Sequence, residues 1–130
     1  MLVKTYAAAI NGIDAIKVTM EVLTDIGFQT IMVGLPDTAV KESTERVASA
    51  LAQCGHEYPR AKVVVNLAPA DVRKEGSAYD LPLAVGILGA SGKIKPESFA
   101  GTLIMGEVTL DGTLMPVKGV LPMAIMARKE

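Results

Sequence analysis

The side chains that could do chemistry concentrate in one short polar loop. It lies within residues 66–84 (NLAPADVRKEGSAYDLPLA), which run from an apolar, β-rich segment through a Gly-containing loop toward a helix. Proteins built from strands and helices place binding and catalytic groups at junctions of this kind. We therefore predict a candidate interaction loop, whose members are Asp71, Arg73, Lys74, Glu75, Asp80 and, from a later hairpin, Lys118.

Three of these residues could form a basic rim around the loop, namely Arg73, Lys74 and Lys118, with Arg60 and Lys62 nearby in the sequence. Solvated surface is the favoured interpretation, because Lys and Arg side chains are mostly exposed in any protein. The sharper alternative is contact with DNA phosphate groups or with a neighbouring subunit.

Asp80 also has two interpretations. It stands at the start of an apolar segment, so the favoured prediction is a helix N-cap whose charge complements the helix dipole. The functional alternative is a carboxylate held at a cleft for a partner or a ligand.

A nucleotide-binding loop and a metal cluster can both be tested against the sequence. Residues 89–93 (GASGK) resemble the end of a phosphate-binding loop, but Ile87 stands where the spacing requires Gly, and Ile94 where it requires Ser or Thr. The segment also closes a helix, whereas phosphate binding uses the N–H groups at a helix start.

Cys54 and His56 are single residues of their type, which predicts packing and capping roles instead of a zinc site. We predict no cofactor and no metal in this chain.

Strands are predicted on both sides of the loop. Residues 2–9 and 15–23 have β-type content, and the second segment alternates apolar and polar side chains from Ile16 to Val22, as a half-buried strand does. Asn11-Gly12 between them is a hairpin turn signal. Further strands are predicted over residues 28–33 and 62–67, the latter central in a sheet, and over residues 102–108 and 114–117, joined by a turn at Asp111-Gly112.

Three helices are predicted. The first starts at Asp37, carries an apolar stripe and stops at Gly55; the stripe is Val40, Val47, Leu51 and Cys54. The second covers residues 81–90, with Pro82 in its first turn and with Gly86 and Gly89 predicting a close approach to the sheet. The third covers residues 120–126. The chain then ends without a Gly or Asn stop signal, so we expect it to be part of a longer protein.

Composition sets outer limits on function. The 130 residues form one predicted domain, residues 1–130, long enough for its own core. The net charge of −1 creates no global basic field, so DNA affinity of this chain alone should be weak. One cysteine fits a reducing cytoplasm. No segment approaches the roughly 18 apolar residues that a membrane span needs, so we expect a soluble protein without membrane contact.

Four sequence phrases carry a resemblance to a known family. They are residues 33–43 (VGLPDTAVKES), 66–71 (NLAPAD), 74–82 (KEGSAYDLP) and 106–122 (GEVTLDGTLMPVKGVLP). In this order they resemble the N-terminal domain of the ComM-type, magnesium-chelatase-like AAA+ proteins, and the resemblance covers nearly the whole chain. The loop and the hairpin also look, more distantly, like the proteolytic domain of Lon, which uses a Ser-Lys dyad.

The Lon comparison places non-reactive side chains at both dyad positions. Ala78 stands where the serine nucleophile would be, and Leu121 where the lysine base would be. A dyad needs a hydroxyl within hydrogen-bond reach of an activating amine. Only a one-residue shift that recruits Ser77 with Lys118 or Lys74 would restore one, and dyad geometry tolerates little displacement. A Lon-like peptidase using Ser77 therefore stays the alternative, as does a purely structural scaffold.

The resemblance implies an α/β fold of the ribosomal-protein S5 domain 2-like class, with a mixed sheet covered by helices. It implies a non-catalytic N-terminal domain that assists ring assembly or DNA engagement in an AAA+ branch-migration motor. Its partners would be the AAA+ module of the same chain, other copies in a hexameric ring and, weakly, DNA. ATP and magnesium are expected only on the ATPase module, outside this sequence.

Overall fold

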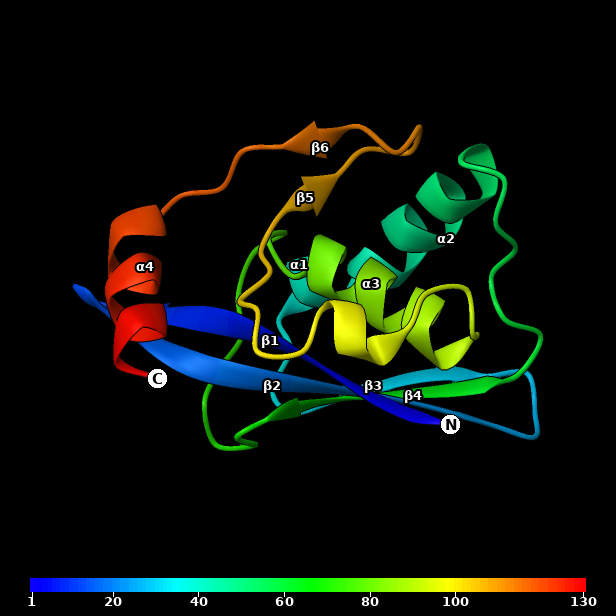
Figure 1. Cartoon of the computed structure of the whole chain (residues 1–130), viewed down its shortest axis with the longest axis horizontal. Helices are drawn as coiled ribbons and strands as arrows, with labels where there is room; N and C mark the ends of the chain where they lie inside the picture. The colour runs from blue at the N-terminus through cyan, green and yellow to red at the C-terminus, as the bar shows by residue number, and fades with distance from the viewer.

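The computed structural model describes residues 1–130, which build a four-stranded sheet with helices packed on one of its faces (Figure 1). The strands are β1 (Leu2–Asn11), β2 (Asp14–Asp25), β3 (Thr30–Val33) and β4 (Lys62–Ala68), in the order β1-β2-β4-β3. β2 is antiparallel to both β1 and β4, and β3 is parallel to β4. The predicted mixed sheet is thus confirmed, with β4 in its interior.

The β1–β2 hairpin forms where the sequence predicted it, although both strands are longer. Asn11 pairs with Asp14, so the loop consists of Gly12 and Ile13. Gly12 has a φ of +64° and Ile13 has no positive φ, which is the pattern of a type II′ turn. Val18, Met20 and Val22 of β2 face the core and are fully buried, because alternate residues of a strand share one face.

The first predicted helix is two helices, α1 (Thr38–Lys41) and α2 (Ser43–Gln53). Asp37 caps α1 as predicted, accepting a hydrogen bond from the Val40 N–H at 2.7 Å. The prediction of one continuous helix was wrong. The Arg46 guanidinium binds the Ala39 carbonyl at 2.9 Å, the acceptor that residue 43 would use in an unbroken helix.

The C-terminal end of α2 is partly as predicted. Gly55 has a φ of +86°, and the His56 N–H returns to the Leu51 carbonyl at 2.8 Å, so Gly55 stops the helix and His56 closes it. Val47 and Leu51 are buried, but Cys54 is exposed at the C-cap. Its predicted place on the apolar stripe was wrong, because the helix ends at Gln53 and Cys54 is the C-cap beyond it.

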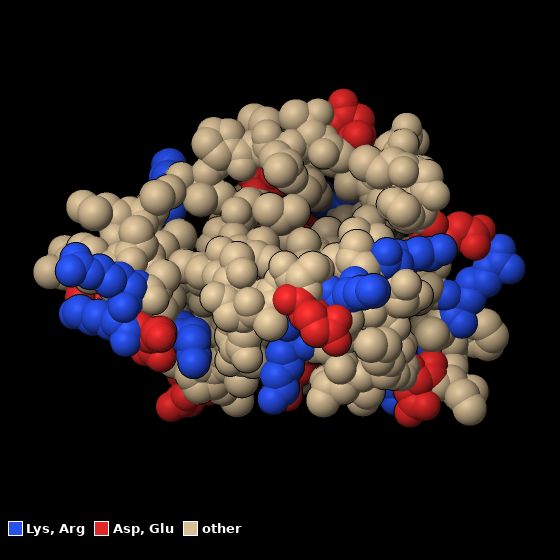
Figure 2. Space-filling view, in the orientation of Figure 1, with Lys and Arg blue, Asp and Glu red and all other residues tan.

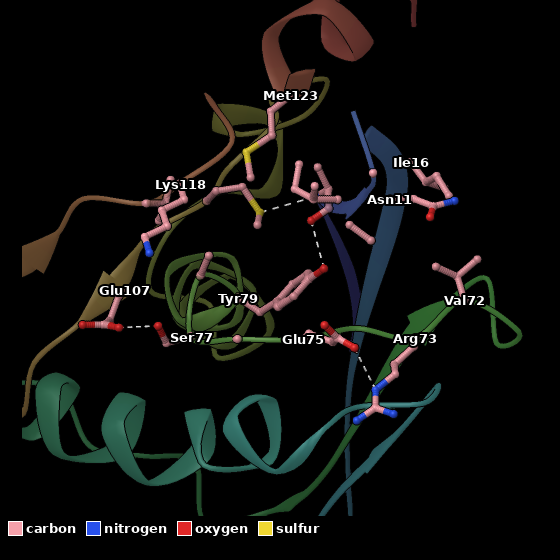
Figure 3. A pocket seen from close by; sticks show the side chains of 18 of the residues that line it. Asn11, Ile16, Val72, Arg73, Glu75, Ser77, Tyr79, Glu107, Lys118 and Met123 are labelled. Carbon is pink, nitrogen blue, oxygen red and sulfur yellow. Dashed lines mark hydrogen bonds and ion pairs between the residues drawn. The ribbon is translucent and has the colours of Figure 1, made fainter. Parts of the chain in front are cut away.

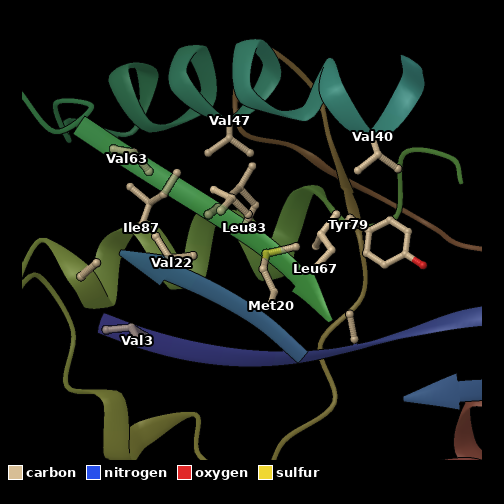
Figure 4. Close-up of a cluster of buried hydrophobic side chains, with 14 of the residues drawn as sticks. Val3, Met20, Val22, Val40, Val47, Val63, Leu67, Tyr79, Leu83 and Ile87 are labelled. Atoms are coloured by element: carbon tan, nitrogen blue, oxygen red, sulfur yellow. The ribbon is translucent and has the colours of Figure 1, made fainter. Parts of the chain in front are cut away.

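Helix α3 (Asp80–Ala90) lies between the sheet and α2, and its side chains complete the core (Figure 4). Leu83 and Ile87 meet core residues from β2, β4 and α2. A Cβ on Gly86 would lie 2.7 Å from Val22 Cγ2, and one on Gly89 would lie 2.9 Å from the Phe99 ring. The close approach predicted for these two glycines is confirmed.

The last third of the chain is less regular than predicted. It contains a short 3-10 helix (Pro96–Ser98), β5 (Glu107–Val108), β6 (Leu114–Met115) and α4 (Val120–Lys129), which packs against the β1–β2 hairpin. Of the strand predicted over residues 102–108, only a single bridge from Leu103 to Tyr6 and the two residues of β5 form. The chain leaves β1 because the Gly106 N–H binds the Ala78 carbonyl at 2.9 Å, beside the start of α3.

Candidate functional site

A cleft of about 840 Å³ opens between the tip of the β1–β2 hairpin, the loop before α3 and the segment that joins β6 to α4 (Figure 3). Half of its 20 lining residues are hydrophobic. Four of the six predicted interaction residues line it, namely Asp71, Arg73, Glu75 and Lys118. The other two, Lys74 and Asp80, are fully buried and do not.

Lys74 is a structural residue, and its predicted place in a basic rim was wrong. Its ammonium group donates to the backbone carbonyls of Gly34 and Leu67, each at 2.7 Å, and to that of Pro69. Burial lowers the pKa of Lys74, and the nearby Asp71 carboxylate partly offsets this. The side chain therefore ties the loop to the end of β4, where three carbonyls supply the acceptors that a buried lysine requires.

Asp80 is an internal ion-pair partner, so its predicted capping role was wrong. Arg46 binds it bidentately, with Nε to Oδ2 at 2.8 Å and Nη2 to Oδ1 at 3.0 Å, and the Val108 N–H donates to Oδ2 at 3.1 Å. The N-cap position belongs to Tyr79, which makes no side-chain cap bond. The carboxylate is 0% exposed, so it is not presented to the cleft either. It joins α2, α3 and β5.

The hydroxyl of Ser77 is not part of a Ser-Lys dyad in this arrangement. It donates its hydrogen bond to Glu107 Oε1, while the Lys74 amine is occupied by three carbonyls. Lys118 lines the same cleft but forms no hydrogen bond with Ser77 (Figure 3). A carboxylate beside the serine does not supply the activating amine that the peptidase alternative needs.

The charged side chains at the cleft do not form a basic patch. Arg73 pairs with Glu75 at 3.0 Å, and both side chains are about two-thirds exposed. Arg60 pairs with Glu57 at 3.5 Å elsewhere on the surface. Acidic and basic groups are interspersed on the face that Figure 2 shows. Of the three residues predicted to form a basic rim, only Lys118 and the paired Arg73 therefore lie at the surface of the cleft.

Two residues of the site escaped the sequence prediction. Tyr79 is buried and donates its hydroxyl to the Ala8 carbonyl at 2.9 Å, and burial raises its pKa well above the ordinary value. Glu107, in β5, accepts the Ser77 hydroxyl. The phrase that begins at Gly106 contained Glu107, but no local pattern linked it to a serine 30 residues earlier.

No three His, Cys, Asp or Glu side chains gather in a way that could hold a metal ion. None of the helices combines the length and the hydropathy that a membrane crossing requires.

Comparison with known proteins gives the family. The model of the family described as subunit ChlI of Mg-chelatase matches residues 19–130. The chain belongs to this family. It is 43% identical over 130 residues to the uncharacterized protein YifB of Escherichia coli, and 41% identical over 126 residues to the competence protein ComM of Haemophilus influenzae. An uncharacterized protein of Mycobacterium tuberculosis is 38% identical over 128 residues.

These alignments cover 99%, 96% and 98% of this chain, respectively, but only 25% of each relative. The chain therefore spans about a quarter of the length of the curated relatives that it matches. The similarity to the ChlI family extends through the loop, the hairpin and α4, so it includes every residue of the candidate site from Asp71 to Lys118.

Proposed function

We propose that this chain is the non-catalytic N-terminal domain of a longer ComM-type, magnesium-chelatase-like AAA+ protein, and that it supports assembly of the ATPase ring. The observation that carries the proposal is a set of exposed apolar side chains on β6 and α4. Its members and their exposed fractions are Leu114 57%, Met115 42%, Val120 60%, Leu121 71% and Ile125 48%. Leu121 and Ile125 lie one turn apart on the same face of α4, and exposed apolar side chains that share a face are typical of protein–protein contacts.

The rest of such a protein supplies the natural partner for this surface. The relatives are about four times as long as the matched region, so they contain further domains against which β6 and α4 can pack. In this proposal the ATPase module binds ATP and magnesium, and copies of the whole protein form a ring, a hexamer by the family resemblance, in the cytoplasm. The work of the ring is branch migration of DNA in recombination and natural transformation.

Direct DNA contact is the lesser part of the proposal. Lys118 is exposed, but Arg73 is neutralised by Glu75 and Lys74 is buried. Few phosphate groups can be neutralised by one copy, so binding would be weak and would fall steeply with salt. A ring multiplies such weak sites, and the gain in avidity needs no new contact.

The test uses the full-length protein with the paired substitution Leu121→Lys and Ile125→Lys. Sedimentation velocity with ATP should show loss of the ring, because two charges enter an apolar contact. The matched control is Ile26→Lys, at a residue that is 96% exposed in the β2–β3 turn, which should leave the ring intact. Melting of the 130-residue chain checks that each substitution leaves the domain folded. A ring that survives the paired substitution contradicts the proposal.

The DNA arm compares full-length wild type with Arg73→Ala/Lys118→Ala on branched DNA across a salt series. If these side chains contact phosphates, the double variant binds more weakly and with a shallower dependence on salt. Unchanged affinity and unchanged salt slope leave assembly as the whole function of the domain.

A further inference from the structure

The outer edge of β1 is only partly covered. In the β1–β2 hairpin the odd-numbered residues of β1 exchange hydrogen bonds with β2, since Asn11 and Asp14 close the two-residue turn. The even-numbered residues direct their N–H and C=O groups to the opposite edge. Tyr6 and Ala8 confirm this, because the Tyr6 carbonyl accepts from the Ile104 N–H at 2.8 Å, and the Ala8 carbonyl accepts from the Tyr79 hydroxyl.

The cleft begins where this cover ends. Leu103 makes one parallel bridge with Tyr6, and the chain then turns toward Ala78. At Ala8 the N–H finds only the Met105 sulfur, at 3.4 Å, which is a weak acceptor. Ile10 is the next residue whose backbone groups face this edge. It lines the cleft, and neither its N–H nor its C=O has a partner across the edge.

The walls of the cleft offer both apolar contacts and charges. Ala8, Tyr79 and Met123 are buried lining residues, and Met105 and Val117 are partly buried. Methionine side chains adapt to different apolar partners, so this lining can accept side chains of varied shape. Three carboxylates, from Asp71, Glu75 and Glu107, line the cleft with two basic groups, from Arg73 and Lys118. That balance disfavours nucleic acid and suits a polypeptide, which carries little charge of its own.

We propose that this cleft binds an extended segment of another polypeptide. The segment adds to the free edge of β1 by hydrogen bonding with the Ile10 backbone, and it places an apolar side chain between Met105, Val117 and Met123. Edge-strand addition of this kind obtains affinity from main-chain hydrogen bonds and selectivity from the neighbouring side-chain contacts. The β6–α4 segment and Met123 of α4 form one wall of the cleft, but none of the five exposed apolar residues proposed to support ring assembly lines it. The two proposals therefore rest on different side chains.

The probe is fluorescein-labelled, reduced and carboxymethylated α-lactalbumin, a permanently unfolded chain, titrated with the 130-residue protein and followed by fluorescence anisotropy. Ile10→Pro removes the free N–H inside the cleft, and it should weaken binding roughly fivefold to tenfold, as expected for one lost main-chain hydrogen bond and the ring that replaces it. Lys4→Pro is the matched control. It removes an N–H from the same edge of β1 outside the cleft and should leave binding unchanged.

A second variant guards against misfolding of the proline variants. Val117→Trp keeps every β1 hydrogen bond and fills the cleft from the β6–α4 segment, so it should also abolish most of the binding. Circular dichroism confirms the fold of each variant. The proposal is overturned if wild type does not bind the unfolded probe, if Lys4→Pro weakens binding as much as Ile10→Pro, or if Val117→Trp binds like wild type. Self-association of wild type that Val117→Trp prevents, without binding of the probe, would assign the cleft to a second copy instead.

Discussion

Replacing Asp80 with alanine should lower the free energy of unfolding of the domain far more than the loss of a helix cap would. The carboxylate is fully buried, binds Arg46 through two hydrogen bonds and accepts a third from the Val108 N–H. Without it, the Arg46 guanidinium loses its buried counter-ion, and the Val108 N–H loses this acceptor. Such half-removed buried pairs are costly, because the remaining charge keeps its desolvation penalty.

The expected magnitude follows from the burial of the two partners. Removing one member of a buried ion pair costs about 3–5 kcal/mol. The Arg46 side chain is 22% exposed, so its freed charge reaches water in part and the loss should lie near the lower end, at about 3 kcal/mol. With about 2.1 cal/mol/K of unfolding entropy per residue, a chain of 130 residues should melt about 11 °C lower. Loss of a cap alone would cost about 0.5–2 kcal/mol.

Thermal and denaturant unfolding of the purified chain measure this difference. The matched control is Glu42→Ala, which removes an exposed carboxylate near Arg46, at 3.9 Å and 61% exposed, and should cost less than about 0.5 kcal/mol. Combining Asp80→Ala with Arg46→Met should cost less than the sum of the two single changes, because no unpaired charge remains. A loss no larger than that of Glu42→Ala, or strict additivity in the double variant, would refute the buried-pair reasoning.

Three further outcomes are expected. Lys74→Met should lower the free energy of unfolding by at least about 2 kcal/mol, because buried carbonyls lose their donor. Arg73→Met, on the surface, should change it by less than about 0.5 kcal/mol. Equal effects of the two substitutions in chemical denaturation would contradict the buried role of Lys74. Gly86→Ala should lower the free energy of unfolding by up to about 2 kcal/mol through overpacking against Val22, offset by a helix-propensity gain of about 1 kcal/mol. In the Val22→Ala background, where the overpacking is relieved, the same substitution should be stabilising. Thermal melting of Gly86→Ala in both backgrounds measures the difference. Burial raises the pKa of Tyr79 above its unfolded value of 10.0, so the stability that Tyr79 contributes is complete below pH 10.0 and is lost as pH rises through the folded pKa. Tyr79→Phe should therefore show a smaller decline in melting temperature at alkaline pH than wild type. An identical decline in the two proteins would contradict this role of Tyr79.

Local sequence features predicted the structure correctly wherever a residue's role depends on its near neighbours in the chain. The alternation in β2, the Asp37 cap and the Gly55 stop all formed as predicted, because strand faces and helix ends are set within a few residues. Gly86 and Gly89 also fulfilled the prediction of close packing. The four family phrases likewise carry the resemblance without any tertiary information, and the family match over residues 19–130 confirms it.

The tertiary structure alone decided the roles of the charged residues. The sequence predicts Lys74 in a surface rim and Asp80 as a helix cap, because nothing beside them in the sequence offers a buried partner. The partners come from far along the chain: Arg46 lies 34 residues from Asp80, and the Gly34 carbonyl lies 40 residues from Lys74. A charge can be buried only when such partners converge on it, and the packing of α2, α3 and β4 brings them together. The same packing places Asp71, Arg73, Glu75 and Lys118 around a cleft, which no local sequence pattern predicts.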